Sequence, residues 1–375
     1  MLASDSRPHI CFRPAGVEDV DALVAIENAS FDADRISRRS FRRFLMSDRD
    51  ILIVATTSDG LAGYILVLLR RGTRLGRIYS LCVSDRFRGR GLATDLLKES
   101  EAVALARGCA YLRLEVRESN AQAISLYVKN GYRKFGVFDD YYEDHASALR
   151  FEKRIRHFDS EHAAIAIPYY PQSTRFSCGP ACLMMAMHAL DPTVAVSPQH
   201  ELRLWRESTT IFMTSGHGGC GPHGMALAAL SRGFGVTLWL NRSDVLFTDG
   251  LRNPEKQAVV ALVQHDFEDQ LAALGIVSQE GELSIDALGV LLSSRQIPVM
   301  LISSWSLARE KAPHWIVVAG VDDEFVYIHD PDADGDDTEN TLDRQYIPID
   351  HLTFKRMTRF GKVGLRAAVV LRKDA

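Results

Sequence analysis

Residues 80–97 read Ser-Leu-Cys-Val-Ser-Asp-Arg-Phe-Arg-Gly-Arg-Gly-Leu-Ala-Thr-Asp-Leu-Leu, and they decide the fold class of the N-terminal half of this 375-residue chain. The apolar run before residue 84 is typical of a strand, and the apolar spacing after residue 91 is typical of a helix. Gly89 and Gly91 lie in the turn between them, where a missing side chain lets the backbone approach a ligand and free helix N–H groups attract phosphate. The stretch therefore indicates either a pyrophosphate-binding turn suited to coenzyme A or a plain strand-to-helix turn.

The sequence on both sides of this turn predicts further helices and strands. The expected helices span residues 17–31, 37–46, 92–107 and 121–130. The expected strands span residues 51–57, 61–69, 77–83 and 111–116, with two more beginning at residues 132 and 148. Asp59 and Gly60 are typical of the turn of a hairpin. The resulting order, ααβββαβαββ, predicts an α/β domain.

Two motifs in this domain resemble those of the GNAT superfamily of N-acetyltransferases. The turn at residues 88–93 matches the acetyl-CoA signature, and residues 81–83 form the strand before it. Residues 114–120, Leu-Glu-Val-Arg-Glu-Ser-Asn, together with Tyr127 and the Gly131-Tyr132 pair, are similar to the ribosomal-protein-alanine N-acetyltransferases. The likeness covers residues 7–155 and implies a GNAT fold with a central mixed sheet.

The resemblance assigns roles to individual residues. It implies that Glu115 is the general base and Tyr127 the general acid. It also implies that acetyl-CoA is the cosubstrate, positioned by Leu81, Cys82, Val83, Arg88, Gly89, Arg90, Gly91, Leu92, Ala93 and Asn120. The chemistry agrees, because an amine must lose a proton before it attacks a thioester, and the departing thiolate needs one. An α-amine, with a pKa of about 8, needs less help than a lysine at about 10.4.

Each of these residues also has a purely structural interpretation. Glu115 can instead form an ion pair with Arg113 or Arg117, and Tyr127 can be a core tyrosine on an amphipathic helix. We favour the catalytic roles because the residues occur together with the phosphate-binding turn. Paired tyrosines occur near the acceptor pocket in the resembled enzymes, so residues 138–142, Phe-Asp-Asp-Tyr-Tyr, are expected to line the acceptor groove. The acceptor itself stays open between an α-amine, a lysine side chain and a small-molecule amine.

A second constellation begins at Cys178, which opens an apolar helix expected over residues 179–190. The dipole of a helix favours a thiolate over a thiol at its N-terminus, so Cys178 is the candidate nucleophile. Gln172 lies six residues upstream and can donate its side-chain amide to a developing oxyanion. His314 and Asp330, at the ends of neighbouring expected strands, supply a base and a group that orients it.

This order of Gln, Cys, His and Asp resembles the papain-like peptidases that trim bacteriocin leader peptides. The likeness covers most of residues 165–335 and implies a papain-like α+β cysteine peptidase domain. Its other elements are expected as a helix over 222–232 and strands over 236–240, 299–303, 315–321 and 325–329. Residues 242–281 look inserted and no transporter segment follows, so the resemblance leaves open both processing coupled to export and double-glycine specificity. The alternative is a peptidase-like fold that only binds peptides.

Composition sets the remaining expectations. The chain exceeds the size at which one core keeps growing, which predicts a domain over residues 7–155, a linker over 156–164 and a second domain over 165–375. The net charge of −4 gives no overall attraction to nucleic acid or anionic membranes, and residues 35–43 are interpreted as a solvated basic helix face. Six scattered cysteines and the lack of a long apolar segment predict a cytoplasmic protein.

Three further signals are assigned no function. Cys182, one helical turn after Cys178, is expected in the core. Residues 217–223, with two histidines and Cys220, are interpreted as a glycine-rich loop rather than a zinc site. The run from Asp330 to Gly335 begins like a calcium loop but has Thr341 where a glutamate belongs. We therefore expect no metal. The combined hypothesis is a bifunctional enzyme that acetylates a peptide or protein α-amine and hydrolyses a peptide bond; the alternative is an acetyltransferase whose second domain only captures peptide.

Overall fold

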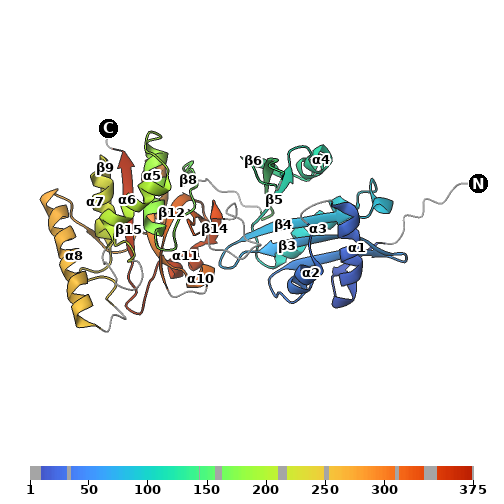
Figure 1. Ribbon diagram of the computed structural model, residues 1–375, viewed down its shortest axis with the longest axis horizontal. Coiled ribbons are helices and arrows are strands. Elements are labelled where there is room, and N and C mark those ends of the chain that lie inside the picture. The colour runs from blue at the N-terminus through green and yellow to red at the C-terminus, as the bar shows by residue number, and fades with distance from the viewer. Residues whose placement is uncertain are drawn as a thin grey trace, which may run out of the picture. The chain divides into compact units, whose positions relative to one another are not determined.

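The computed structural model describes residues 10–31, 35–142, 144–156, 163–209, 218–248, 253–308, 312–332 and 344–373. The chain divides into an N-terminal unit, residues 1–70 and 74–158, and a C-terminal unit, residues 71–73 and 159–375. Most of the expected linker, residues 157–162, lies outside the described residues. Figure 1 shows the elements of both units.

The N-terminal unit alternates strands and helices. Its helices are η1 (Val17–Asp19), α1 (Val20–Ser30), α2 (Arg38–Leu45), η2 (Asp85–Phe87), α3 (Leu92–Ala106) and α4 (Ala121–Lys129). Its strands are β1 (Cys11–Pro14), β2 (Ile51–Thr57), β3 (Gly60–Leu69), β4 (Leu75–Val83), β5 (Tyr111–Arg117), β6 (Arg133–Phe138) and β7 (Ala148–Arg154). This confirms the predicted α/β class and every predicted helix and strand of the unit.

One strand was not predicted from the sequence. Strand β1, Cys-Phe-Arg-Pro, pairs with β2 at the edge of the sheet. A four-residue strand that ends in proline has too few alternating positions to give a period-two signal. The edge position suits it, because proline donates no hydrogen bond to a neighbour.

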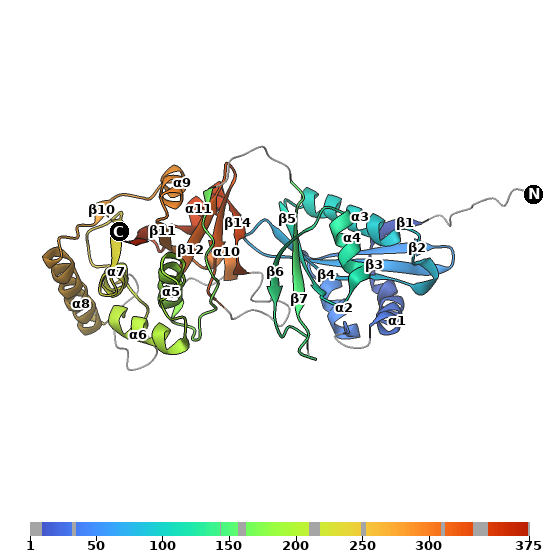
Figure 2. The same ribbon diagram turned by 90° about the horizontal axis from the view of Figure 1, so that it is seen from above.

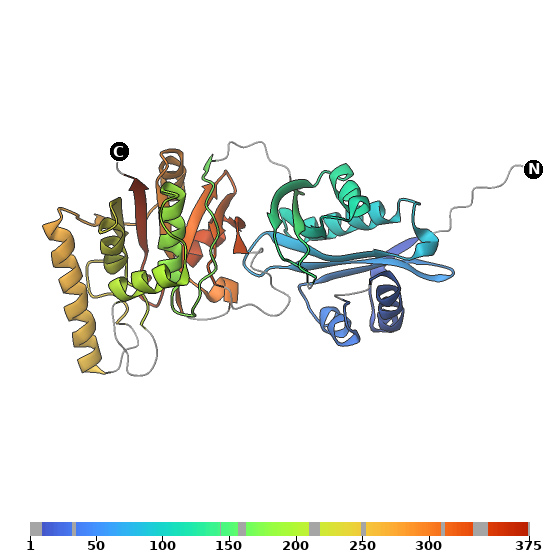
Figure 3. The ribbon, with the colours of Figure 1, turned by 45° about the horizontal axis from the view of Figure 1, so that its top comes forward.

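The described strands of this unit form one sheet in the order β1-β2-β3-β4-β5-β7-β6. The β4–β5 pair is parallel and its other pairs are antiparallel, so the sheet is mixed as expected. Figures 2 and 3 show α1 and α2 on one face and α3 and α4 on the other. Alternation of side chains along each strand supplies a separate apolar core to each face.

Strands β4 and β5 separate along their length. They pair only through Leu75–Arg77 and Tyr111–Arg113, although β4 continues to Val83 and β5 to Arg117. On its other edge, β4 pairs with β3 from Gly76 to Val83. The backbone edge of β4 that faces β5 therefore opens into a gap after Arg77.

The C-terminal unit combines a sheet with helices on its faces. Its described helices are α5 (Cys178–Leu190), α6 (Pro198–Ser208), α7 (Pro222–Leu230), α8 (Pro254–Ala273), α9 (Ile285–Ser293), α10 (Trp305–Ala308) and α11 (His351–Met357). Its described strands are β8 (Ala163–Ala164), β9 (Phe234–Leu240), β10 (Gln279–Glu280), β11 (Ile297–Ser303), β12 (Pro313–Val321), β13 (Phe325–His329), β14 (Ile347–Asp350) and β15 (Ala367–Lys373).

These strands form a sheet in the order β10-β9-β15-β11-β12-β13-β14, with β8 beside β12. Helix α5 packs on β11, β12 and β15, and α7 packs on β9 and β15. Ten of the thirteen residues of α5 are buried, which explains why its sequence is apolar almost all round. The helix is the centre of this core and carries Cys178 at its first position.

The expected helices and strands of this unit are present, but several elements were not predicted: α6, α8, α9, α10, α11, β8, β10, β14 and β15. Helix α8 lies within residues 242–281, which were interpreted as an insertion, and packs beside α7 at the edge of the unit (Figures 1 and 2). Its apolar residues are divided, since Val260 and Leu271 are buried but Leu262 is 71% exposed. That division weakens the periodic signal on which prediction depends.

None of the described helices has both the length and the hydropathy needed to cross a lipid bilayer.

The separate cores give a testable difference between the units. Leu96 on α3 is fully buried, whereas Leu105 on the same helix is 42% exposed. We expect Leu96→Ala to destabilise the N-terminal unit by about 2–5 kcal/mol and Leu105→Ala by about 0.5 kcal/mol or less. All four tryptophans, Trp205, Trp239, Trp305 and Trp315, belong to the C-terminal unit.

Denaturant unfolding followed by two probes tests this expectation. Leu96→Ala should shift part of the far-ultraviolet circular dichroism transition and leave the tryptophan fluorescence transition unchanged. Equal shifts in both signals would show that the two units unfold together.

Candidate functional site

The N-terminal unit contains a cavity of about 630 Å³ beside the end of β4, where β4 no longer pairs with β5. Its walls come from the end of α1, the end of β4, the turn before α3, and α4. The lining residues are Ser30, Phe31, Leu81, Cys82, Val83, Phe87, Arg88, Gly89, Gly91, Leu92, Ala93, Thr94, Asn120, Gln122, Ala123, Ser125, Leu126, Tyr127 and Lys129. The cavity therefore brings nearly all of the sequence-predicted cofactor residues together.

The glycine turn forms an open cradle at one end of this cavity. Gly89 and Gly91 have φ angles of 74° and 86°, and Gly91 is the residue that precedes α3. A Cβ atom built on either glycine would meet nothing within 4 Å. The left-handed backbone and the open space next to the N–H groups of α3 fit a phosphate group.

The two arginines of the turn lie differently. Arg88 lines the cavity, pairs with Asp85 at 2.8 Å and donates from Nε to the Val83 carbonyl at 3.3 Å. Arg90 places its guanidinium 5.9 Å from the centre of the Phe87 ring and is not among the described residues that line the cavity. Of the two, Arg88 is the better placed to meet a bound phosphate.

Strand β4 offers the cavity its backbone more than its side chains. The Cys82 side chain is 3% exposed and packs in the core beneath α1 and α2. Burial raises the pKa of the Cys82 thiol to about 11. Cys82 is therefore not a reactive thiol, and its contribution to the cavity is the main chain that β5 leaves unpaired.

Tyr127 lines the cavity from α4 and is 8% exposed. Its ring makes an edge contact with Tyr132, at 5.7 Å between ring centres, and a tilted contact with Phe151 at 6.5 Å. Burial, with a smaller contribution from Tyr142, raises the pKa of Tyr127. The phenol is held protonated at neutral pH, which is the state a proton donor requires.

Glu115 lies on β5 in a buried ion pair. Arg77 Nε donates to Glu115 Oε2 at 2.8 Å, and Arg150 Nε lies 4.0 Å from Oε1. Glu115 therefore forms an ion pair, as its structural interpretation expects; Arg113 and Arg117, the partners expected there, have ion pairs with other carboxylates. Side chains alternate along β5, so those two arginines point to the same face but bind Glu152 and Asp144 instead.

Arg77 also connects Glu115 to the expected acceptor segment. Its Nη2 donates to the Tyr141 hydroxyl at 2.8 Å. Tyr141 packs edge-on against Phe138 and Tyr142, and Arg117 lies 4.2 Å from the centre of the Tyr142 ring. Glu115 is absent from the described lining of the cavity, because Leu114 and Val116 on either side of it face the α3 and α4 core.

Asn120 has a structural role as well as a place in the cavity wall. Its Oδ1 accepts a hydrogen bond from the Ala123 N–H at 3.0 Å and so caps α4. The cap fixes the beginning of the helix that carries Tyr127.

In the C-terminal unit, Cys178 is the first residue of α5 and is partly buried. His314 is the second residue of β12, and Asp330 follows the end of β13. Strands β12 and β13 are antiparallel, with Val317 opposite His329. The beginning of β12 and the end of β13 therefore lie at the same end of the sheet. The structure therefore brings Cys178, His314 and Asp330 together from three distant segments.

His314 connects the other two. Its Nε2 is 2.7 Å from Asp330 Oδ1, and Cys178 lies near enough to contribute to its pKa. Burial alone would lower the pKa of His314, but the charge and hydrogen bond of Asp330, with a contribution from Cys178, raise it well above the usual 6.5. His314 is thus held in its protonated form near Cys178.

Asp330 is itself held on several sides and is 1% exposed. Arg344 Nη1 donates to its Oδ2 at 2.9 Å, and the Asp332 N–H donates to its Oδ1 at 3.1 Å. The Asp330 N–H in turn donates to the Arg344 carbonyl at 2.9 Å. These contacts fix the carboxylate as a hydrogen-bond acceptor for His314.

Gln172 lies beside the same segment. Its N–H donates to the Pro331 carbonyl at 2.8 Å, and its Nε2 contacts Asp332 Oδ1 at 3.4 Å. Its Oε1 has no hydrogen-bond partner among the described residues. The side-chain amide of Gln172 thus makes one long hydrogen bond, and its backbone is bound next to Asp330, a residue of the expected catalytic set.

The discounted signals have clear positions. Cys182 is fully buried, as expected for a core residue, and its thiol donates to the Trp315 carbonyl at 3.3 Å. His223 is buried on α7, 3.6 Å from Glu268 of α8, whereas His217 lies outside the described residues. So do Asp334, Gly335 and Thr341 of the calcium-like run. Within the described ranges, no group of three His, Cys, Asp or Glu residues can hold a metal ion.

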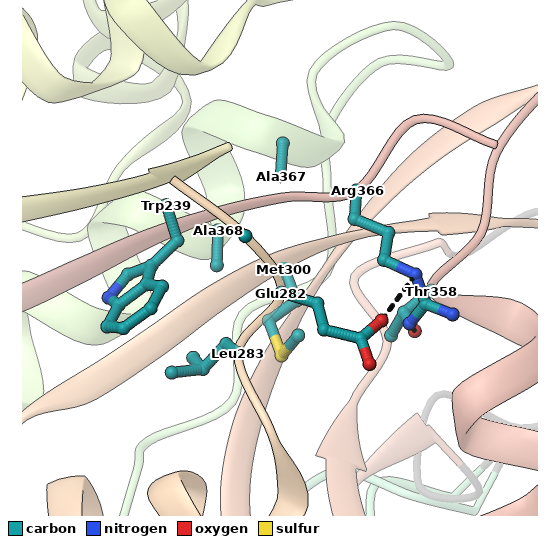
Figure 4. A pocket seen from close by; sticks show the side chains of 9 residues that line it. Trp239, Glu282, Leu283, Met300, Thr358, Arg366, Ala367 and Ala368 are labelled. Carbon is teal, nitrogen blue, oxygen red and sulfur yellow. Dashed lines mark hydrogen bonds and ion pairs between the residues drawn. The ribbon is translucent and has the colours of Figure 1, made fainter. Parts of the chain in front are cut away.

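A second hollow lies beside strands β9, β11 and β15 of the C-terminal sheet (Figure 4). Arg366 crosses it to pair with Glu282 at 2.9 Å and donates to the Thr358 hydroxyl at 3.1 Å. Trp239, Leu283 and Met300 form its apolar part. The remaining space is about 10 Å³, which is no more than the room one water molecule needs. This hollow is too small for a substrate.

Sequence reasoning missed Arg77 and Arg344. Both are buried arginines that bind a candidate catalytic carboxylate, and each is distant in sequence from its partner. An isolated arginine gives no motif, so only the folded chain reveals the pairs.

Two family models match the chain. Residues 167–372 match the Peptidase_C39 like family, and residues 20–132 match the Acetyltransferase (GNAT) family. An uncharacterised N-acetyltransferase of Methanocaldococcus jannaschii is 33% identical over 138 residues, which is 36% of this chain and 86% of that protein. An uncharacterised protein of Mycobacterium leprae is 33% identical over 132 residues, 33% of this chain and 34% of that protein, so the chain spans about a third of that relative's length.

Solved structures match part of the chain. The ribosomal-protein-S18-alanine N-acetyltransferase of Escherichia coli is 23% identical, with a TM-score of 0.37, and the match covers 40% of this chain and 97% of that one. Ard1 of Thermoplasma volcanium is 22% identical, with a TM-score of 0.36, and the match covers 40% of this chain and 99% of that one.

The family matches agree with the two constellations that the fold assembles in separate units. The chain belongs to the GNAT acetyltransferase family through its N-terminal unit and to the Peptidase_C39-like family through its C-terminal unit.

Proposed function

We propose that the N-terminal unit transfers an acetyl group from acetyl-CoA to the α-amine of a peptide or protein, and that the C-terminal unit hydrolyses a peptide bond through Cys178. The single observation that carries the first activity is the 630 Å³ cavity that joins the glycine turn to Tyr127. The second activity is supported by the hydrogen bond between His314 and Asp330 and by the position of Cys178 near His314.

The cavity suits acetyl-CoA at both ends. The N–H groups at the beginning of α3 and the side chain of Arg88 can bind the pyrophosphate. The unpaired edge of β4, residues 81–83, can hydrogen-bond an extended chain in the way that a neighbouring strand would. When bound there, acetyl-CoA supplies an activated acyl group as a thioester.

Acid and base functions then fall on opposite faces of the sheet. Tyr127 lies on the cavity side and can protonate a departing thiolate, because burial keeps its phenol protonated. Glu115 lies on the other face and can accept a proton from an incoming amine, directly or through water. Its ion pair with Arg77 keeps the carboxylate charged, which favours an acceptor that needs little help to lose its proton.

That consideration favours an α-amine over a lysine side chain as the acceptor. A carboxylate stabilised by an arginine is a weak base, and the α-amine has the lower pKa, by about 2.5 units. Tyr141 hydrogen-bonds to Arg77 and can form part of the acceptor groove. The competing acceptors, lysine and small amines, are separated by comparing short peptides with free and blocked N-termini, with and without lysine.

The proposed peptidase reaction uses three groups in sequence. The Cys178 sulfur attacks the carbonyl carbon of the scissile bond, and the Gln172 amide stabilises the oxygen that becomes negative. His314 gives its proton to the leaving amine, which leaves a thioester on Cys178. His314 then takes a proton from water, whose oxygen attacks the thioester and releases the acid product.

The two proposed reactions can be linked. Peptide hydrolysis creates a new α-amine, which is the class of acceptor proposed for the N-terminal unit, so the two reactions can act in sequence on one substrate. The six cysteines form no disulfide, which supports the expected reducing, cytoplasmic location. The second candidate function, a C-terminal unit that only binds peptides, predicts no covalent adduct at Cys178.

The glycine turn provides a test of acetyl-CoA binding. We expect Gly91→Ala to weaken acetyl-CoA binding about tenfold or more, because a Cβ would occupy the space in which a phosphate meets the backbone. Gly60→Ala is the matched control, since Gly60 also has a positive φ, 112°, and open space but lies in the β2–β3 hairpin. Isothermal titration with acetyl-CoA measures both variants, and equal losses of affinity would contradict the assignment.

Tyr127 provides a test of acid catalysis. Tyr127→Phe keeps the ring and its packing, so we expect kcat to fall about 10²-fold or more while the KM for acetyl-CoA changes little. Because the pKa of Tyr127 is raised, wild-type kcat should show no loss from tyrosine ionisation up to about pH 10. Tyr132→Phe, a buried neighbour on the same cluster, is the control. CoA release is measured chromatographically, and an unchanged kcat for Tyr127→Phe removes the residue from catalysis.

Thiol reactivity tests the second site within the same molecule. At pH 6 we expect iodoacetamide to label Cys178 at least about tenfold faster than exposed Cys11, because His314 retains a proton that favours the thiolate. His314→Ala and Asp330→Asn should lower that ratio, since each removes or weakens the protonated imidazole. Intact-mass and peptide mass spectrometry give both rates. A wild-type ratio near one would favour the binding-module alternative.

A further inference from the structure

A fully buried carboxylate outside the expected catalytic set lies beneath the loop that carries Gln172. Glu201, on α6, has no exposed surface. Among the described residues, its oxygens accept hydrogen bonds from Tyr170, Ser173 and Ser177 of loop 169–177, which leads directly into Cys178. No arginine, lysine or histidine of the described chain forms an ion pair with it. A buried carboxylate without a cation needs a different explanation from the ion pairs elsewhere in the protein.

The hydrogen bonds span the loop on both sides of Gln172. Glu201 Oε1 accepts from the Ser173 N–H at 2.9 Å and from the Ser177 hydroxyl at 2.5 Å. Oε2 accepts from the Ser173 hydroxyl at 2.6 Å and from the Tyr170 hydroxyl at 2.9 Å. Burial and the bond to Glu201 raise the pKa of Tyr170 to about 12, so its phenol remains a donor. One carboxylate thus fixes three positions of the loop.

The opposite side of the loop is attached to the segment after β13. The Gln172 N–H donates to the Pro331 carbonyl at 2.8 Å, and the Tyr169 hydroxyl donates to the Asp330 carbonyl at 3.0 Å. The loop is therefore bonded to α6 on one side and to the Asp330 segment on the other. Ser177, the last residue bound by Glu201, immediately precedes Cys178 at the start of α5.

We propose that Glu201 is a positioning residue that holds loop 169–177 so that the Gln172 amide faces the oxygen formed during attack by Cys178. This inference rests on the proposed peptidase function and adds a residue to it. An apolar side chain could fill the same volume at lower cost in desolvation. A carboxylate is needed because only an acceptor with several lone pairs can bind four donors from one short loop.

Two reagents separate positioning from general destabilisation. The Cys178 sulfur adds to the carbonyl carbon of a peptide aldehyde. The carbonyl oxygen of the aldehyde then becomes negative and needs stabilisation. Iodoacetamide alkylates the same sulfur with loss of iodide and forms no such oxygen. The experiment compares both reactions in the full-length wild type, Glu201→Ala, Glu201→Gln, Gln172→Ala and the double variant Gln172→Ala/Glu201→Ala. A panel of acetylated tripeptide aldehydes is used.

We expect Glu201→Ala to weaken aldehyde binding about tenfold or more, as Gln172→Ala does, and to change iodoacetamide alkylation by less than about threefold. The double variant should be no weaker than Gln172→Ala alone, because Glu201 acts through Gln172. Glu201→Gln should fall between wild type and Glu201→Ala. Glu207→Gln is the matched control, since Glu207 lies on the same helix but is 46% exposed and pairs with Arg232.

Several results would overturn the proposal. Unchanged aldehyde binding in Glu201→Ala, multiplicative losses in the double variant, or equal losses with both reagents would each leave Glu201 as a structural residue. If Glu201→Ala fails to fold, Tyr170→Phe and Ser173→Ala take its place, because each removes one side-chain donor to Glu201. We expect each of them to weaken aldehyde binding by a smaller factor and to leave alkylation by iodoacetamide nearly unchanged.

Hydrogen exchange keeps this proposal separate from the proposed activity. If the wild-type protein binds no aldehyde at Cys178, the proposed peptidase function is wrong. The positioning role is then tested by the hydrogen-exchange rates of the backbone amides of residues 172–177. Faster exchange confined to these amides in Glu201→Gln supports the positioning role. Unchanged exchange overturns it.

Discussion

Free backbone N–H groups at the beginning of two helices determine where both candidate sites form. The first turn of an α-helix has N–H groups without partners inside the helix, and they carry a partial positive charge. Helix α3 begins after Gly91 beside the opening between β4 and β5, and α5 begins at Cys178 beside the edge of β12. In one unit the helix start can receive a phosphate, and in the other it favours a thiolate.

Both sites then depend on buried charge that is compensated locally. Arg77 balances Glu115, and Arg344 balances Asp330, which leaves one oxygen of Asp330 to accept from His314. Without these cations, each carboxylate would tend to take up a proton in its buried surroundings. Glu201 is the contrasting case, because neutral donors alone surround it. The Glu201 carboxylate therefore holds a loop in place and binds no cation among the described residues.

The N-terminal fold was predictable because its sequence is locally consistent. The hairpin at Asp59-Gly60, the glycine turn and the helical spacing of α3 each indicate one structure, and the structure has it. The prediction failed where the local signal was short or divided. Strand β1 has only four residues, and α8 exposes Leu262 while it buries Leu271, so neither shows a clear period. Strand β15 owes its place to pairing with β9 and β11, which are distant in the sequence.

The sequence by itself determined which residue types stand at the two helix starts, the order of the strands and helices around them, and the chemistry that Cys178 and the glycine turn can support. Only the tertiary structure decided that Arg77 binds Glu115, that Arg344 binds Asp330 and that Glu201 holds the loop before Cys178. The physical reason is that helix starts and strand periods are set by neighbouring residues. The partner of a buried charge is set by which distant segments pack together, and no local pattern records that choice.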